Sequence, residues 1–404
     1  MDERIVITGM GAVTPVGVGV PAYWRGLTSG RCGIGEISRI DTAKLQIKWA
    51  AEAREFHAGD FLPTRLVMDL EPYMQYAYVS AEEAVKESGL NTRSPRVGIV
   101  MGTALSGISV IGETHTQNVT AGKQAGPKFL LKAMGNIAAA QFAISHGIQG
   151  PSMTVSTACS SGGDAITLAA LLIRSGAADA IVVMAGEAAV CPTLIQSLDK
   201  AGALSKTGES RPFDKSRNGF VLGEGGGALV LESAEHATLR GAEILAELLG
   251  YANNTDAYNP VSPNPDGKGA AACMKIALQN AGLQADEVNY INAHGTATPM
   301  GDAAEASAIR QVFGERPVFV SSTKGATGHM MGAGGITEVI ACVKAIETGI
   351  MPRNLGLAQR DEACDLNIVA EHNDRQQVRV ALSNAMGFGG QNSCIVVGKY
   401  GGRQ

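Results

Sequence analysis

Two helical segments of the chain are apolar on nearly every side, and each follows a short apolar run that is typical of a strand. The segment from about 159 to 174 contains Ala165, Ile166, Leu168, Ala169, Ala170, Leu171, Leu172 and Ile173, and the segment 334–348 contains Ile336, Val339, Ile340, Ala341, Val343 and Ile346. A helix that is apolar all round is buried on all sides. One such helix in each half predicts a layered architecture built from two pseudo-duplicated halves.

The rest of the chain alternates strand-like and helical stretches. Expected strands are 5–8, 97–101, 152–157, 180–184, 288–291, 318–321, 378–382 and 393–397, with two short strands around a glycine-rich kink in 219–231. Expected helices are 77–88, 128–144, 270–281 and 302–313. This alternation predicts an α/β fold with parallel sheets covered by helices. The 51 glycines suit the many tight turns of such a fold.

Composition excludes several classes of protein. The net charge is −5, so nothing indicates a nucleic-acid surface. The seven cysteines show no CxxC pair, which argues against a disulfide framework or a zinc cluster. The start of the chain has no basic region followed by an apolar run, and the most apolar stretch, 180–186, is too short to span a bilayer. We therefore expect a cytoplasmic protein with reduced thiols and neither a membrane nor a nucleic acid as partner.

The segment V-S-T-A-C-S-S-G-G at 155–163 marks Cys159 as a candidate nucleophile. A strand ends there, and the thiol is expected at the start of a buried helix, whose N-terminus favours the thiolate. The small residues that follow allow a substrate to approach. A buried, inert thiol is the alternative, and it is our interpretation for the remaining cysteines, Cys32, Cys191, Cys273, Cys342, Cys364 and Cys394.

Two histidines follow strand-like runs in the second half. His294 lies in N-A-H-G-T-A-T-P-M-G-D, and His329 lies in S-S-T-K-G-A-T-G-H-M-M-G-A-G-G together with Lys324. Glu338 follows in the next helix. In parallel α/β folds, sites gather at the carboxyl ends of strands. A satisfied core histidine is the alternative for His294 taken alone.

One thiol and two imidazoles suit carbon–carbon bond formation through thioesters. The thiolate takes an acyl chain as a covalent thioester. Two imidazole N–H groups can hold the carbonyl of a malonyl donor and stabilise the enolate formed as CO₂ leaves. The glycine-rich stretch 387–390 can bring a backbone N–H close to the thiol, although such a stretch often marks only a turn or bulge.

At these residues the sequence resembles the β-ketoacyl-acyl-carrier-protein synthase II family of the thiolase superfamily. The resemblance covers essentially the whole chain and includes I-T-G-M-G-A-V-T-P-V-G, T-A-C-S-S-G, R-P-F-D-K-S-R-N-G-F-V-L-G-E-G, H-G-T-A-T-P-M-G-D and G-F-G-G. It implies a thiolase fold with a five-layer α-β-α-β-α core, usually in a dimer. We expect the two halves at 1–250, with the nucleophile, and 251–404, with both histidines.

The resemblance also implies roles for individual residues. Cys159 corresponds to the nucleophile, His294 and His329 to the decarboxylation pair, and Lys324 and Glu338 to their support. The oxyanion hole would use the N–H groups of Cys159 and Phe388, Thr296 and Thr298 would contact the pantetheine arm, and the acyl pocket would involve Leu105, Leu198, Met386 and Phe388. An acyl carrier protein would deliver both substrates on its phosphopantetheine arm, and the enzyme would need no metal or cofactor of its own.

Several positions depart from the family pattern. Residues 65–71 lack the usual basic stretch, Gly202 stands where arginine is frequent, and Leu198 and Met386 replace phenylalanines. Asp164 is more typical of ketosynthases from type II polyketide systems. These differences favour a specialised ketosynthase for polyketide or polyene chains. Its partner would be a second copy or a related subunit similar to a chain-length factor, and fatty-acid synthesis stays open.

Other functions fit less well. A biosynthetic thiolase would use a second cysteine as base, and an initiating synthase would use Cys-His-Asn, which His329 contradicts. A non-catalytic scaffold of the same fold would lack Cys159. A dinucleotide-binding dehydrogenase would need a third glycine where Thr14 stands. A papain-like protease does not suit the α/β pattern.

Overall fold

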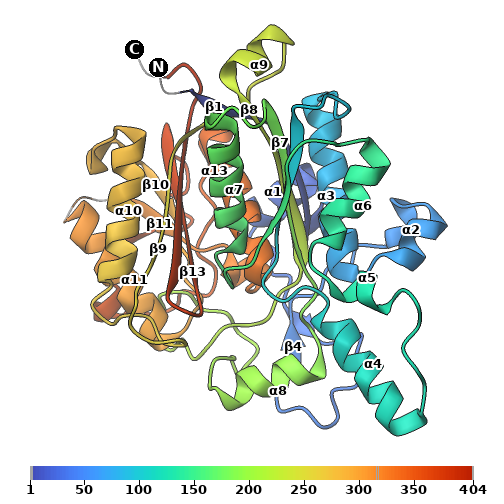
Figure 1. Ribbon diagram of the computed structural model, residues 1–404. Coiled ribbons are helices and arrows are strands. Elements are labelled where there is room, and N and C mark those ends of the chain that lie inside the picture. The colour runs from blue at the N-terminus through green and yellow to red at the C-terminus, as the bar shows by residue number, and fades with distance from the viewer. Residues whose placement is uncertain (1–2, 315, 317, 403–404) are drawn as a thin grey trace.

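Two sets of five strands with the same spatial order form the framework of the protein (Figure 1). The computed structural model describes residues 3–314, 316 and 318–402. The first set, in the order β6-β5-β7-β8-β1, comprises β1 (Ile5–Thr14), β5 (Val97–Gly102), β6 (Ser152–Val155), β7 (Ala180–Glu187) and β8 (Gly225–Ser233). The second, in the order β11-β10-β13-β14-β9, comprises β9 (Ala246–Thr255), β10 (Tyr290–Asn292), β11 (Phe319–Ser321), β13 (Val380–Gly387) and β14 (Gln391–Gly398). Numbered along the chain within each set, both orders are 3-2-4-5-1.

The pairing directions are also the same in both sets. The second strand of each set pairs in parallel with the third and fourth, and the fifth pairs antiparallel with the fourth and first. The prediction of parallel sheets was therefore wrong in part, because each set is mixed. Antiparallel neighbours can be joined by a tight turn, as β13 and β14 are, where Gly389 and Gly390 adopt φ of 84° and 73°. Residues 5–7 of β1 pair with 246–248 of β9 and join both sets into one sheet.

Helices cover this framework in layers. The central helices α7 (Ser161–Arg174) and α13 (Gly334–Thr348) lie between the two sets of strands, and Figure 1 shows α10 (Lys268–Ala281) and α11 (Pro299–Phe313) on one outer side. On the other outer side lie α3 (Pro72–Ser88) and α6 (Ile137–His146). The five-layer α-β-α-β-α fold is thus confirmed. Burial of α7 is less complete than predicted, because Leu171 is 51% exposed.

The two central helices meet through glycines at their N-termini. A Cβ atom on Gly335 would lie 2.6 Å from the backbone nitrogen of Gly163, and one on Gly162 would lie 2.5 Å from the carbonyl oxygen of Gly332. Real Cβ atoms do not come this close, so side chains here would push the helices apart. The glycines therefore allow the first turn of α7 to touch the first turn of α13 and the residue Gly332 just before it.

Several elements differ from the sequence predictions. The expected helix 128–144 is two helices, α5 (Phe129–Ala133) and α6, and 219–231 contains one regular strand, β8, instead of two. Elements without a prediction are β9, α1 (Val20–Thr28), β2 (Gly17–Val18), β3 (Gly35–Glu36), β4 (Trp49–Ala50), α2 (Thr64–Asp69), α4 (Ile108–Ala121), α8 (Pro192–Lys200), α9 (Ala234–Leu239), α12 (Lys324–Thr327) and β12 (Asn367–Ile368). Among the helices that the structure describes, none combines the length and apolarity needed to cross a membrane.

Candidate active site

Cys159 lies in a tight turn between β6 and α7. Ala158, just before it, adopts φ of 51°, a left-handed conformation that costs a residue with a Cβ atom about 1–3 kcal/mol. Serine hydroxyls support the turn: Ser161 Oγ donates to the carbonyl of Ala158 at 2.6 Å, and Ser160 Oγ donates to the carbonyl of Thr157 at 2.7 Å. The turn therefore presents the thiol away from the strand, ahead of the helix.

His329 lies in direct contact with the thiol, because its Nε2 is 3.0 Å from Cys159 Sγ. Burial raises the pKa of Cys159 to about 12, and Lys324 lowers that pKa only in part. The expectation of a thiolate favoured by the helix is thus contradicted for the free enzyme. The helix begins at Ser161, two residues after the thiol, so its terminal N–H groups do not offset the loss of water around the sulfur.

The two histidine rings face the same space. Their centroids are 5.3 Å apart and their planes lie at 87°, while Phe220 packs edge-on against His329 at 5.2 Å. Burial lowers the pKa of both imidazoles well below the usual value, and Lys324 lowers both further. Both rings are therefore neutral at pH 7, and each has one N–H group to donate.

Glu305, which the sequence analysis missed, organises the backbone around His294. Its carboxylate accepts hydrogen bonds from the N–H groups of His294 and Gly295, both at 2.8 Å, and from Asn384 Nδ2 at 3.2 Å. Gly295 adopts φ of 34°. Glu305 lies eleven positions after His294 inside α11, and only the fold shows that its side chain returns to the strand end.

Lys324 and Glu338 form a buried ion pair behind the histidines, at the start of α12 and within α13. Burial raises the pKa of Glu338 to about 7, and Lys324 opposes that rise. The structure thus brings these two predicted residues together. Their effect on the site is electrostatic, because Lys324 lowers the pKa of the thiol and of both imidazoles.

The turn between β13 and β14 places Phe388 next to Cys159. The N–H of Phe388 donates to Cys159 and lowers the pKa of its thiol. A Cβ atom on Gly387 would lie 2.9 Å from the backbone nitrogen of Cys159, so glycine is required for this approach. The Phe388 side chain is 40% exposed. The turn thus brings the backbone N–H of Phe388 to the thiol and the backbone of Gly387 against that of Cys159.

The predicted binding residues fall into separate groups. Thr296 and Thr298 lie after His294 with their hydroxyl oxygens 3.2 Å apart. Leu105 and Leu198 pack in the same apolar cluster as Cys159, together with Phe220 and Met331. Met386 instead packs against the cluster beneath α10 and α11. The structure therefore brings Leu105 and Leu198, but not Met386, into the apolar surroundings of the thiol.

The motif R-P-F-D-K-S-R serves as a frame for the loop after His294. Asp302 accepts hydrogen bonds from the N–H of Phe213 at 2.7 Å and of Ala297 at 3.0 Å. Asp214 accepts from Ser216, Ala358 and Gln359, which ties this motif to the segment beyond α13. The motif indicates no role by itself, because its role depends on these distant partners.

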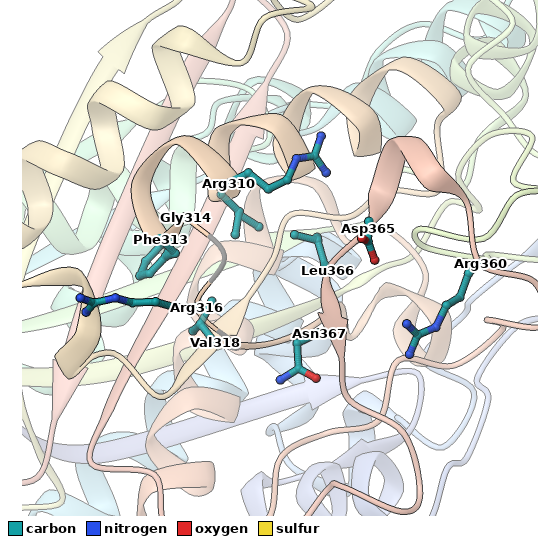
Figure 2. A pocket seen from close by; sticks show the side chains of 10 residues that line it. Arg310, Phe313, Gly314, Arg316, Val318, Arg360, Asp365, Leu366 and Asn367 are labelled. Atoms are coloured by element: carbon teal, nitrogen blue, oxygen red, sulfur yellow. The ribbon is translucent and has the colours of Figure 1, made fainter.

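A hollow of about 470 Å³ lies away from this chemistry, between the end of α11 and β12. Figure 2 shows its three arginines, Arg310, Arg316 and Arg360, with guanidinium groups that do not converge on one point. Arg310 donates to the carbonyl of Ala363, and Arg316 pairs with Asp286 at 2.8 Å. This hollow therefore lacks the features of an anion site. No group of three or more metal-ligating side chains occurs among the described residues.

Comparisons with known proteins place the chain in a family. Residues 2–237 match the family described as Beta-ketoacyl synthase, N-terminal domain, and 245–358 match Beta-ketoacyl synthase, C-terminal domain. The chain is 38% identical to a 3-oxoacyl-[acyl-carrier-protein] synthase 2 of Synechocystis sp., covering 98% of each chain. It is 37% identical to the protein of that name from Coxiella burnetii, covering 98% of this chain and 99% of that one.

Solved structures show the same fold over the full length. The ishigamide ketosynthase/chain length factor aligns with a TM-score of 0.94 at 33% identity, covering 99% of this chain and 100% of that one. A type II PKS ketosynthase in complex with its acyl-carrier protein aligns with a TM-score of 0.89 at 30% identity, with the same coverage. The family models, the relatives and the fold together show that the chain belongs to the β-ketoacyl synthase family.

Proposed function

We propose that this protein is a 3-oxoacyl-[acyl-carrier-protein] synthase that condenses a malonyl unit with an acyl chain held on Cys159. The observation that carries the proposal is the contact between thiol and imidazole, with His329 Nε2 3.0 Å from Sγ and a second neutral imidazole beside it. The proposed reaction has two halves, transfer of the acyl chain to the thiol and decarboxylation followed by condensation. The site offers a thiol for the first half, two neutral imidazole N–H donors for the second, and two backbone donors for the oxyanion.

In the first half-reaction, the sulfur of Cys159 attacks the thioester carbonyl of an acyl chain on the phosphopantetheine arm. A carbon–sulfur bond to Cys159 forms, the bond to the pantetheine sulfur breaks, and the proton of the thiol passes to the leaving sulfur. Because the thiol is protonated in the free enzyme, its proton must leave during attack, and His329 is placed to receive it. The N–H groups of Cys159 and Phe388 stabilise the oxyanion.

In the second half-reaction, the bond between the malonyl carboxylate and its methylene carbon breaks. CO₂ leaves, and the electron pair forms an enolate, whose oxygen accepts hydrogen bonds from His294 and His329. His329 donates through Nε2 in this step, because once the thiol is acylated this nitrogen no longer receives its proton and carries the hydrogen of the neutral ring. Neutral imidazoles suit this task, because they donate without giving up a proton. The enolate carbon attacks the acyl-Cys159 carbonyl, the carbon–sulfur bond breaks, and the thiolate takes a proton from solvent.

The proposed partner of the enzyme is an acyl carrier protein. The enzyme is also proposed to act in the cytoplasm and to need no metal or cofactor of its own. The 3-oxoacyl-[acyl-carrier-protein] synthase relatives and the ketosynthase solved with its carrier support the choice of an acyl carrier protein as partner. Both substrates bring their own phosphopantetheine arm, which Thr296 and Thr298 are proposed to contact. Whether the pathway makes fatty acids or polyketides is decided by which carrier the enzyme accepts.

A second subunit is proposed to pair along the edge of the sheet at β6. This edge strand is exposed, Met153 is 45% exposed, and Ile144 on the neighbouring α6 is 76% exposed. An unpaired apolar strand edge of this kind normally needs a cover. The partner is either a second copy or a subunit similar to the chain length factor of the ishigamide protein. The molecular mass in solution, measured by light scattering, separates a dimer of this chain from a monomer awaiting another subunit.

The test of the catalytic proposal is intact-protein mass after incubation with a panel of acyl carrier proteins. The wild type should gain one acyl group and Cys159→Ala none, and the preferred chain would distinguish fatty-acid from polyketide substrates. An adduct that persists in Cys159→Ala would contradict the assigned nucleophile. A lack of adduct with every donor, even when a chain-length-factor subunit is supplied, would favour the scaffold role.

A further inference from the structure

A buried carboxylate lies beside the nucleophile turn and has no part in the chemistry above. Asp164, in the first turn of α7, is 4% exposed. Its Oδ2 accepts hydrogen bonds from Thr157 Oγ1 at 2.5 Å and from Ser160 Oγ at 3.2 Å. Thr157 precedes Cys159 by two positions and Ser160 follows it directly, so one carboxylate oxygen holds both sides of the turn.

The turn needs these hydrogen bonds to Asp164 because its backbone is strained. The left-handed φ of Ala158 persists only if surrounding contacts determine it. The serine bonds described above lie within the turn and the adjoining start of α7. The bond between Thr157 and Asp164 spans seven residues and ties the strand side of the turn to the body of the helix. Without it, relaxation of the turn would move the backbone N–H of Cys159.

The other carboxylate oxygen faces the strand that leads from the oxyanion turn. Asp164 Oδ1 is buried and has no partner with hydrogen-bond geometry, and the same is true of Ser393 Oγ on β14. Asp164 and Ser393 are nonetheless close enough to interact. Burial raises the pKa of Asp164, and Ser393 lowers it. A Cβ atom on Gly163 would lie 2.5 Å from Ser393 Oγ. Asp164 thus lies between the turn with Cys159 and the hairpin with Phe388.

We infer that Asp164 is a positioning residue that holds the N–H of Cys159 in register with the N–H of Phe388. Its carboxylate fixes the turn through Thr157 and Ser160 and packs against the hairpin at Ser393. The inference rests on the proposed function, since it concerns the oxyanion hole of that reaction. It predicts that loss of the carboxylate harms acyl transfer, which needs both N–H groups, more than simple alkylation of the thiol, which needs neither.

The experiment compares two reactions of Cys159 in the full-length protein. Acylation by acyl carrier protein is followed by intact mass over time, and alkylation by iodoacetamide is followed in the same way. Loss of one oxyanion donor costs about 10²–10³ in rate, so we expect Asp164→Ala to slow acylation by at least about tenfold. Alkylation should proceed close to the wild-type rate.

Two further variants distinguish a positioning role of Asp164 from a general loss of protein structure. Asp164→Asn should restore acylation, because its amide oxygen can accept the same two hydroxyls and its nitrogen can donate to Ser393 Oγ. Thr157→Val should slow acylation even if Asp164→Ala fails to fold. The matched control is Thr167→Val, one turn further along α7, whose buried hydroxyl has no partner; this variant should behave as the wild type.

The inference is overturned if Asp164→Ala or Thr157→Val acylates at the wild-type rate, or if acylation and alkylation fall in parallel. It is also overturned if Asp164→Asn is as slow as Asp164→Ala, because the carboxylate would then matter for its charge. Failure of the proposed function looks different. In that case the wild type itself takes no acyl group from any carrier, while iodoacetamide still modifies Cys159.

Discussion

The carboxylate of Glu305 accepts a hydrogen bond of 2.8 Å from the backbone N–H of His294, so a residue inside α11 fixes the histidine that follows β10. The imidazole of His294 makes no comparable bond of its own, since its Nδ1 is buried without a partner. The orientation of this ring therefore depends on its backbone and on packing.

Replacement of Glu305 by alanine should impair decarboxylation selectively. We expect the release of CO₂ from malonyl-acyl-carrier protein to fall about 10²-fold, as when one fixed donor is displaced from a transition state. Acylation of Cys159 should change little, because Glu305 contacts the His294 segment and not the thiol. Glu305→Gln keeps one acceptor oxygen and should be milder. Equal losses in both reactions would contradict this division.

The two histidines should differ in acyl transfer. Only His329 contacts the sulfur in the structure, at 3.0 Å. His329→Ala should therefore slow both acylation and decarboxylation, whereas His294→Ala should slow decarboxylation alone. Intact mass reports the first reaction and CO₂ release the second. If His294→Ala also failed to acylate, the proton path through His329 would be wrong.

Gly301 controls the hydroxyl of Thr298. A Cβ atom at position 301 would lie 2.3 Å from Thr298 Oγ1, so Gly301→Ala should displace it. Loss of one hydrogen bond to the pantetheine arm, worth about 1 kcal/mol, should raise KM for malonyl-acyl-carrier protein about fivefold, with kcat nearly unchanged. Gly112→Ala, whose Cβ atom would meet its nearest neighbour at 3.6 Å, is the matched control. An unaltered KM would argue against a role for Thr298 in binding.

Asp214 should make stability depend on pH in the acidic range. Hydrogen bonds from Gln359, Ser216 and Ala358 outweigh burial and lower the pKa of this carboxyl to about 2. Its contribution is present above the unfolded pKa of about 4 and is lost as pH falls toward 2, because in this range the unfolded chain binds a proton at Asp214 that the folded protein does not. The contribution amounts to roughly 2 kcal/mol.

The measurement is urea unfolding of the wild type and Asp214→Asn between pH 2.5 and about 6. The variant should be less stable at the upper end, and the difference should shrink as pH falls. A difference that stays constant with pH would mean that the Asp214 carboxyl has the same pKa in the folded and unfolded states.

The sequence indicated the catalytic side chains because each one marks a strand end. Cys159, His294 and His329 stand in short runs of small residues directly after apolar strands, a local pattern that does not depend on distant partners. The apolar character of α7 and α13 predicted a layered architecture of two similar halves, because such helices are buried on nearly all sides. The five-layer arrangement itself was predicted from the resemblance to the β-ketoacyl-acyl-carrier-protein synthase II family, not from periodicity.

What was missed depends on contacts between distant segments. Glu305 and Asp214 look like ordinary carboxylates until the fold places backbone N–H groups around them. The mixed strand directions could not be read from the alternation of strands and helices, because β8 pairs antiparallel with β1 and β14 pairs antiparallel with β9, and each partner lies far away in the chain. The raised pKa of Cys159 follows from burial by residues far away in the chain.

The duplicated strand order has a further consequence for what would happen if the chain were cut between the two repeats. In one repeat the chemistry follows the third strand, as Cys159 follows β6, and in the other it follows the second and third, as His294 and His329 follow β10 and β11. The two repeats thus carry different parts of the proposed chemistry, one the thiol that accepts the acyl chain and the other the two histidines proposed to stabilise the enolate. Neither fragment of a chain cut between the repeats could work alone, and activity would return only when the two fragments associate.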